Sequence, residues 1–318
     1  MLDALVAGLE WTYRFSTPLI WLSIALFVLG AVTERAERVG PEQTRWVYAV
    51  AWVTLTLYWV AMIHYFTVRR TSLVEGIAVV AGVPLSLYIA YLIASGRESL
   101  FTLSRAVAAM GLFYMPMVAV PVVRQFLVET VARHTEIVLN AVGVYPRMVD
   151  GLTVDGYRIA EKTHPYRSTF VYYVDGDPLT HTIVIACTGI GSMAIVAGLV
   201  AAVEAPLSRK LQALAVALPV IYVLNVARNV FISASMGRQL LHVFPEFIIS
   251  AFALEHSVMV SYIVADRLIA QTLSVVALVG ILWLIVRYVP EVLSVVEEAL
   301  TLLTGREYDL TTAFGTSR

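Results

Sequence analysis

The residue best suited to covalent chemistry is the chain's single cysteine, Cys187. It stands in the segment IVIACTGIGSMAIVAGLV, where Thr188, Gly189, Gly191 and Ser192 follow it. Small residues let a neighbouring backbone or a substrate come close. The start of a helix favours a thiolate and offers unpaired N–H groups to a developing oxyanion. The segment is therefore interpreted either as a nucleophile beside a membrane helix or as an inert thiol in a helix-packing notch.

A second polar group lies in the segment VIYVLNVARNVFIS. The spacings of three and four residues among Asn225, Arg228 and Asn229 place all three side chains on one face of a helix. An arginine between two amides is poorly suited to face lipid, which indicates a buried polar site. The alternative is an arginine near a helix end whose charge reaches up to the membrane surface.

A third group lies in the segment EFIISAFALEHSVMVSYIVADR, which contains Glu255, His256, Asp266 and Arg267. His256 and Arg267 are eleven residues apart, so they differ in depth by roughly 16 Å on a straight helix and cannot both flank one thiol. Arginine stays protonated, so His256 is the better proton carrier if it lies within reach. The alternative interpretation assigns these residues no catalytic role. In that case Asp266 and Arg267 mark a helix end, and Glu255 and His256 form a buried polar pair.

The composition identifies the surroundings of these groups. Of the 318 residues, 59% are apolar and only 14% are charged, whereas a soluble domain has about 45–50% apolar and about 25% charged residues. This balance excludes a soluble enzyme and a disordered chain, and the net charge of -1 excludes a strongly basic nucleic-acid-binding protein. A single thiol excludes an internal disulfide and a CxxC metal site. No metal or nucleotide motif is present, so we expect no metal and no cofactor.

Long apolar runs recur along the chain, and a membrane-spanning helix needs about 20 such residues. The candidate spans are 16–33, 45–66, 74–95, 101–121, 183–204, 211–235, 246–268 and 270–289. The pattern predicts an all-α polytopic membrane protein with a bundle of about seven or eight transmembrane helices.

Residues 122–182 interrupt this pattern. They begin with an amphipathic stretch and continue with short β-branched or aromatic runs between Asp-Gly turns. We expect an amphipathic helix that lies on the membrane surface or packs over the bundle. A small extracytoplasmic cap with short strands would follow it; the alternative to this cap is a long connecting loop. The predicted organisation is N-terminal transmembrane helices over 1–121, this helix and cap over 122–182, catalytic transmembrane helices over 183–289, and a C-terminal tail over 290–318.

Charge asymmetry sets the expected orientation. The positive-inside rule places Arg209, Lys210 and the loop 35–45 in the cytoplasm, and therefore the cap outside. Arg69 and Arg70 conflict with this orientation, because four crossings before the cap would place them outside as well.

The orientation has a consequence for the candidate site. Cys187 would lie a few residues into its span, near the outer face. If 246–268 is one straight crossing, Arg267 ends on the opposite side of the membrane. Either that segment is kinked or re-entrant, or the number of crossings is off by one. His256 is the fallback if Arg267 is remote.

The segments ACTGIGS (186–192) and NVARN (225–229), followed by an arginine in a later helix, resemble the exosortase/archaeosortase family. The order and spacing of the motifs and a multi-span chain of this length all agree with that family. Arginine as the third residue, rather than histidine, favours the archaeal branch, the archaeosortases.

The resemblance implies a membrane-embedded cysteine transpeptidase without a cofactor. Its partners would be exported proteins, such as an S-layer glycoprotein, that end in a tripartite signal: a Pro-Gly-Phe motif, a transmembrane helix and a basic cluster. The new C-terminus would pass through a thioester to a membrane lipid acceptor. The resemblance makes Cys187 the nucleophile and Arg228 and Arg267 the other catalytic residues. His256, Asn225, Asn229 and Ser192 would support them, near the extracytoplasmic face of the cell membrane.

Two other functions were weighed against this one. A transporter or channel for an anionic solute would be lined by Arg228, His256 and Arg267, but 1–121 has almost no charge at mid-span and no repeat is visible. A rhomboid-like serine protease would use Ser192, which lacks a convincing Gly-x-Ser-Gly motif.

Overall fold

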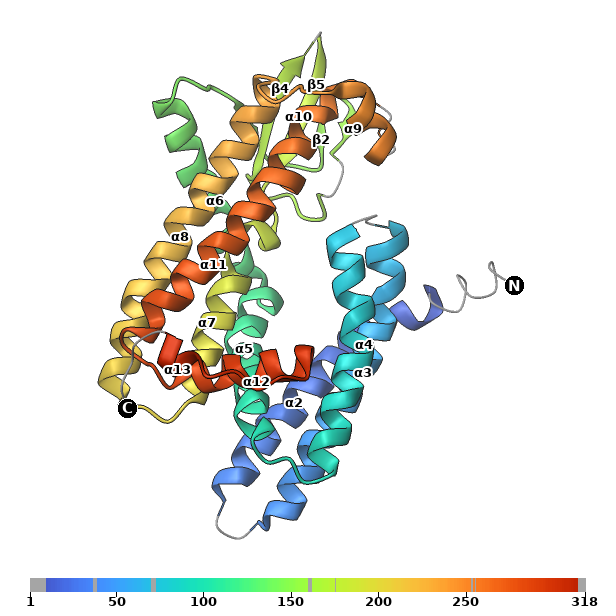
Figure 1. Cartoon of the computed structure of the whole chain (residues 1–318). Coiled ribbons are helices and arrows are strands. Elements are labelled where there is room, and N and C mark those ends of the chain that lie inside the picture. The colour runs from blue at the N-terminus through green and yellow to red at the C-terminus, as the bar shows by residue number, and fades with distance from the viewer. Residues whose placement is uncertain are drawn as a thin grey trace. The chain divides into compact units, whose positions relative to one another are not determined.

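The computed structural model describes residues 10–36, 39–69, 73–159, 162–174, 176–252, 254 and 256–313. Arg70 and Glu255 lie outside these ranges. Six described helices are long and apolar enough to cross a membrane, and helices dominate the fold (Figure 1). The predicted class, a helical polytopic membrane protein, is confirmed. The chain forms two compact units: Met1–Phe113 with Ala197–Ala205 and Pro290–Arg318, and Tyr114–Val196 with Pro206–Val289.

The first unit is built around the N-terminal helices. They are α2 (Ser16–Arg35), α3 (Pro41–His64), α4 (Leu73–Ala94) and α5 (Leu100–Ala119), with α12 (Val292–Thr304) and α13 (Leu310–Ala313) from the tail. The end of α5, from Tyr114 onward, belongs to the second unit. Their bounds agree with the first four predicted spans to within a few residues. The Trp52 indole donates a 2.9 Å hydrogen bond to Ser104 Oγ. Arg105 and Glu34 form a 3.0 Å ion pair. The first contact is buried and the second is partly buried, and together they position α2, α3 and α5 outside the candidate site.

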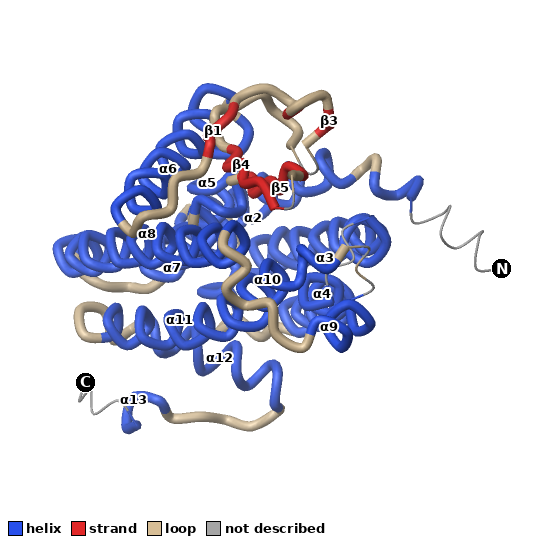
Figure 2. The backbone as a smooth tube through the Cα atoms, turned by 90° about the horizontal axis from the view of Figure 1, so that it is seen from above, coloured by secondary structure: helices blue, strands red, loops and turns tan. Residues whose placement is uncertain are grey.

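The second unit contains α6 (Pro121–Ala141) and short strands, as predicted for this part of the chain. The strands are β1 (Arg147–Val149), β2 (Thr153–Val154), β3 (Tyr157–Arg158), β4 (Thr169–Val174) and β5 (Asp177–Thr182). They form an antiparallel sheet of order β1-β4-β5 and a separate β2-β3 pair, which lie close together in Figure 2. The register pairs Phe170 with His181 and Thr169 with Thr182. The end of β5 leads directly into the segment that carries Cys187.

The remaining helices of this half follow β5. A 3-10 turn (Ile185–Thr188) precedes α7 (Ile190–Ala202), which continues into the first unit, and then come α8 (Leu207–Gly237) and α9 (Pro245–Phe252). A further 3-10 turn (Ser257–Met259), α10 (Val260–Ile263), a π-helical segment (Val264–Ala270) and α11 (Gln271–Val286) complete the series.

The division of the last apolar region into spans 246–268 and 270–289 is wrong. The short helix α9 ends at Phe252, and one apolar helix then runs over Ser257–Val286. The charged pair Asp266 and Arg267 suggested a boundary, but it lies inside this helix. The π-helical turn contains both residues, and ion pairing accommodates their charges within the helix. The described residues thus contain six apolar helices of spanning length and the shorter apolar helix α7.

Candidate active site

Cys187 lies in a turn between the sheet and a membrane helix. Its N–H donates a 2.8 Å hydrogen bond to the Val184 carbonyl, and its side chain is half-buried. Gly189 has φ +78, a left-handed conformation that glycine adopts without strain, and this lets the chain turn into α7 at Ile190. Cys187 therefore precedes the helix, and the prediction that it lies a few residues inside a span is wrong by about one turn.

Two amides hold this turn against α8. Asn225 Nδ2 and Asn229 Nδ2 donate hydrogen bonds of 2.7 Å and 2.9 Å to the Cys187 carbonyl oxygen. Residues four apart share a helix face, which is why both amides reach the same acceptor. We call this pair the amide clamp. The structure thus brings Asn225 and Asn229 to Cys187, as their predicted supporting role requires.

One carboxylate joins the two candidate arginines. Arg228 Nη2 donates a 2.6 Å hydrogen bond to Asp266 Oδ1, and Arg267 Nε lies 3.6 Å from Asp266 Oδ2. The side chain of Asp266 is 14% exposed and those of the arginines are each 28% exposed. In such surroundings charges interact more strongly than in water. Asp266 therefore fixes the direction of Arg228 and holds Arg267 beside it.

The two arginines lie at the same level along their helices. Arg228 is nine residues before the end of α8 at Gly237, and Arg267 is ten residues after Ser257. At about 1.5 Å per residue these distances are about 14 Å and 15 Å. The helices run side by side in opposite directions (Figure 1). A straight crossing over 246–268 would put Arg267 on the opposite side of the membrane from Cys187. The observed helix runs over Ser257–Val286 instead, so Arg267 lies inside it, at the level of Arg228.

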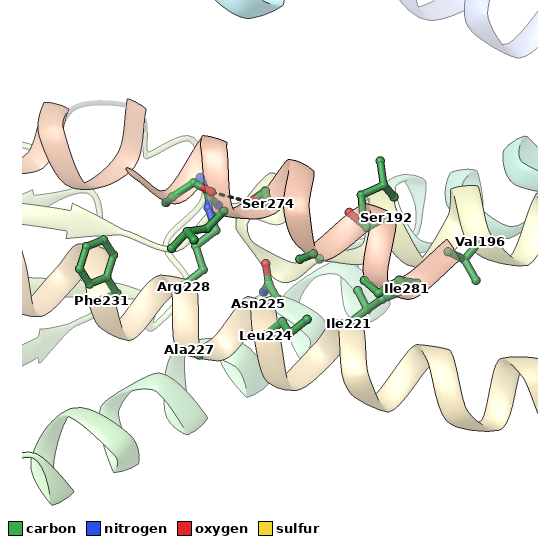
Figure 3. Close-up of a pocket in the computed structure, with 15 residues that line it drawn as sticks. Ser192, Val196, Ile221, Leu224, Asn225, Ala227, Arg228, Phe231, Ser274 and Ile281 are labelled. Carbon is green, nitrogen blue, oxygen red and sulfur yellow. Dashed lines mark hydrogen bonds between the residues drawn. The ribbon is translucent and has the colours of Figure 1, made fainter. Parts of the chain in front are cut away.

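Asn225 of the clamp and Arg228 border a cavity of about 350 Å³, whereas Cys187, Asn229 and Arg267 are not among its lining residues. Gly189, Ser192, Asn225 and Arg228 line it together with mostly apolar side chains of α8 and α11. Figure 3 shows Arg228 and Asn225 extending from α8, with Ser192 on the opposite wall. Because Arg228 and Asn229 are consecutive on α8, the Cys187 turn and the arginine pair meet at the same part of that helix.

His256 does not join this group. It is exposed and directly precedes the turn Ser257–Met259. It is not among the residues that line the cavity, and its eleven-residue separation from Arg267 corresponds to about 16 Å along a helix. The predicted supporting role of His256 is therefore without structural support.

The structure instead places His181 near the arginine pair, a residue that the sequence interpretation missed. It is buried on β5, with ring centroids 6.2 Å from Tyr262 and 6.3 Å from Phe170. Burial lowers the pKa of His181 to about 4; the Asp266 carboxylate opposes this shift and Arg228 adds to it. Its imidazole is therefore neutral at pH 7, and within the described residues its Nδ1 has no hydrogen-bond partner.

No local sequence motif indicates His181, because only the pairing of β4 with β5 brings its side chain against Phe170 and Tyr262. The local sequence around Asp266 is compatible with a helix end, and only the packing of α8 against the later helix reveals its ion pair with Arg228. The described residues contain no cluster of three or more metal-ligating side chains.

Comparison with known proteins identifies the family. A family model for transmembrane exosortases matches residues 10–259. Archaeosortase A of Haloferax volcanii is 42% identical over 307 residues, which cover 93% of this chain and 97% of that protein. Archaeosortase A of Natronomonas pharaonis is 36% identical over 291 residues, which cover 91% and 89% of the two chains. No solved structure matches. The chain thus belongs to the transmembrane exosortase family.

Proposed function

We propose that the chain is a membrane-embedded cysteine transpeptidase. It cuts exported proteins at a C-terminal tripartite signal of the Pro-Gly-Phe type and joins the new C-terminus to a membrane lipid. An S-layer glycoprotein is the expected kind of substrate. The observation that carries the proposal is the amide clamp, which ties the Cys187 turn to α8 directly beside Arg228 and its partners Asp266 and Arg267.

In the first step the Cys187 thiolate attacks the scissile carbonyl. The positive charges of Arg228 and Arg267 stabilise the thiolate and then the oxyanion of the tetrahedral intermediate. Collapse breaks the C–N bond, releases the amine and leaves a thioester on Cys187. In the second step a lipid nucleophile attacks the thioester carbonyl and the thiolate departs.

Both steps need a group that takes up and returns a proton. Arginine stays protonated at all relevant pH values and serves poorly as a base. We assign this role to His181, because its ring packs against Tyr262 of the helix that carries Asp266 and the Asp266 carboxylate favours the protonated imidazole that forms when His181 accepts a proton. His181 replaces His256, which is exposed, whereas His181 is buried.

The cavity suits a signal in which a short motif adjoins a transmembrane segment. Arg228, Asn225 and Ser192 provide polar groups, while Val196, Ile281 and other residues provide an apolar wall. A substrate would place its peptide bond near the polar groups and its apolar segment along the helices. No described feature favours the anionic-solute transporter, since the cavity lining is mostly apolar and His256 is absent from it.

We place the site near the extracytoplasmic face. Arg209 and Lys210 stand at the start of α8, and Arg209 Nη1 donates a 3.5 Å hydrogen bond to the Tyr288 carbonyl just beyond α11. The positive-inside rule puts this basic end in the cytoplasm. Arg228 lies toward the other end of α8, the end that the Cys187 turn contacts.

The proposal is tested in cells that lack the endogenous enzyme and make a substrate with the C-terminal signal. Wild-type protein is expected to shorten the substrate, while Cys187→Ala leaves it full length at unchanged enzyme abundance in the membrane. His256→Gln serves as the histidine control and is expected to process normally. Normal processing by Cys187→Ala would reject the nucleophile assignment.

A further inference from the structure

A second cavity of about 130 Å³ lies beside the turn that carries Cys187. Its polar lining includes Arg124, Lys162, His164, Tyr166, Ser168 and Thr182. Three of the lining residues, Arg124, Lys162 and His164, bear or can acquire positive charge, and no carboxylate is among the described lining residues. The volume is several times the roughly 10–15 Å³ that a single water requires, so a small polyatomic group fits.

The basic residues keep capacity to bind an anion. Arg124 donates from Nε to the Tyr166 hydroxyl and from Nη1 to the Val118 carbonyl, both at 3.1 Å. A guanidinium has five N–H donors, so these bonds leave others available. The Lys162 side chain is buried, and its Nζ donates to the Val149 carbonyl at the long distance of 3.4 Å.

The electrostatics of the cavity favour a negative ligand. Burial lowers the pKa of Lys162, although the nearby Asp150 opposes this shift. Burial and the charge of Arg124 lower the pKa of His164. Both shifts mean that positive charge is unfavourable here without a compensating anion. An anion bound among these side chains would relieve that cost and accept charge-assisted hydrogen bonds from them.

The cavity lies where a membrane segment ends and where the proposed transfer takes place. Val118 borders it one residue before the end of α5, a candidate span. Val184 and Ile185 border it as well, and the Cys187 N–H is bonded to the Val184 carbonyl. The end of a span is the level of lipid headgroups, so a headgroup in this cavity would lie close to the thioester.

We propose that this cavity binds the phosphate of the lipid acceptor's headgroup. The inference rests on the proposed function and names the acceptor's class, a phospholipid whose headgroup carries a hydroxyl or an amine. Arg124 and Lys162 hold the phosphate, which orients that nucleophile toward Cys187. Its O–H or N–H attacks the thioester carbonyl carbon and gives up its proton to a base. The C–S bond then breaks and the Cys187 thiolate is restored.

The test separates acceptor binding from cleavage. Purified full-length protein in vesicles receives a substrate with the C-terminal signal and one of two nucleophiles. The first is a limiting amount of an ethanolamine phospholipid, and the second is hydroxylamine, a small nucleophile without phosphate. Lys162→Gln and Arg124→Gln are expected to slow lipid transfer at least about tenfold through loss of a charge-assisted contact. Their release of product to hydroxylamine is expected to stay within twofold of wild type.

Matched variants complete the test. Arg133→Gln removes an exposed arginine of the same helix, outside this cavity, and is expected to transfer at the wild-type rate. Lys162→Arg keeps the charge and is expected to recover most of the transfer. If Lys162→Gln transfers normally, or loses both reactions in parallel, the inference is overturned. If Cys187→Ala still cleaves the substrate, the proposed function fails instead.

The source of the phosphate is tested with two further arms. Vesicles whose acceptor is a phosphate-free glycolipid are expected to support little transfer, and inorganic phosphate at millimolar concentration is expected to compete only weakly with the phospholipid. Equal transfer to the glycolipid would contradict a phosphate subsite. Tight, Lys162-dependent binding of inorganic phosphate without any effect of lipid phosphate would contradict a headgroup subsite.

Discussion

Arg228 Nη2 lies 2.6 Å from Asp266 Oδ1, and this ion pair joins α8 to the helix over Ser257–Val286. The second oxygen of the same carboxylate lies 3.6 Å from Arg267 Nε. One acidic residue thus holds both cations, and Arg228 directly precedes Asn229, which bonds to the Cys187 carbonyl. The proposed mechanism depends on these cations pointing toward the substrate carbonyl, which makes Asp266 a positioning residue.

Replacing Asp266 tests this relationship. Asp266→Asn keeps the shape but removes the charge, so two partly buried arginines lose their counter-ion, and breaking such a pair is strongly destabilising. We expect the rate of substrate cleavage by reconstituted protein to fall at least about tenfold, with partial recovery in Asp266→Glu. Glu298→Gln is the matched control, because Glu298 pairs with Arg97 at 2.9 Å outside the site. A wild-type cleavage rate in Asp266→Asn would show that the carboxylate does not position the arginines.

Gly189 and Gly191 form a matched pair near the cysteine. A Cβ at Gly189 would lie 3.0 Å from Asn225 Cγ, and its φ of +78 is strained for alanine, whereas a Cβ at Gly191 meets nothing within 4 Å. Gly189→Ala is expected to displace the amide clamp and to reduce cleavage at least about tenfold, since a left-handed alanine alone costs about 1–2 kcal/mol. Gly191→Ala is expected to keep wild-type activity. Equal rates in the two variants would argue against a precise fit at this turn.

The amide clamp predicts non-additive effects. Either single variant, Asn225→Ala or Asn229→Ala, leaves one donor on the Cys187 carbonyl, while the double variant leaves none. An unsatisfied buried carbonyl costs about 1–3 kcal/mol, so the double variant is expected to lose more activity than the two single losses combined. Asn140→Ala, at an exposed position at the end of α6, provides the control. Strictly additive losses in a double-mutant cycle would mean that the two amides act separately.

His181 predicts a pH-dependent stability. Its pKa is about 4 in the folded protein and about 6.5 when unfolded. Between these values the unfolded chain binds a proton that the folded chain does not, so stability falls as the pH decreases. The loss from this residue is about 2 kcal/mol at pH 5.

The matching measurement compares melting temperatures in detergent at pH 7.5 and pH 5.0. His181→Gln is expected to show a smaller decrease in melting temperature than wild type, because glutamine does not titrate. His256→Gln, which alters an exposed histidine, is expected to behave as wild type. An unchanged pH dependence in His181→Gln would mean that His181 is protonated in the folded protein.

The features predicted well from the sequence depend on neighbouring residues. Hydropathy located the first four helices, and three- and four-residue spacing placed Asn225, Arg228 and Asn229 on one face. The predictions were wrong or incomplete where contacts between segments distant in the sequence determine the structure. The charges of Asp266 and Arg267 resemble a helix end until α8 supplies a partner 38 residues away. His181 is brought against Tyr262 only by the register of β4 and β5 and by the packing of the sheet on the later helix.

The central claim is that Cys187 carries the substrate as a thioester. The most direct measurement incubates purified protein with substrate, quenches in acid and determines the mass of the peptide that contains Cys187. The expected result is an adduct of the substrate's new C-terminal residue on Cys187 that hydroxylamine removes and that is absent in Cys187→Ala. Substrate cleavage without any adduct on Cys187, or cleavage by Cys187→Ala, would contradict the account.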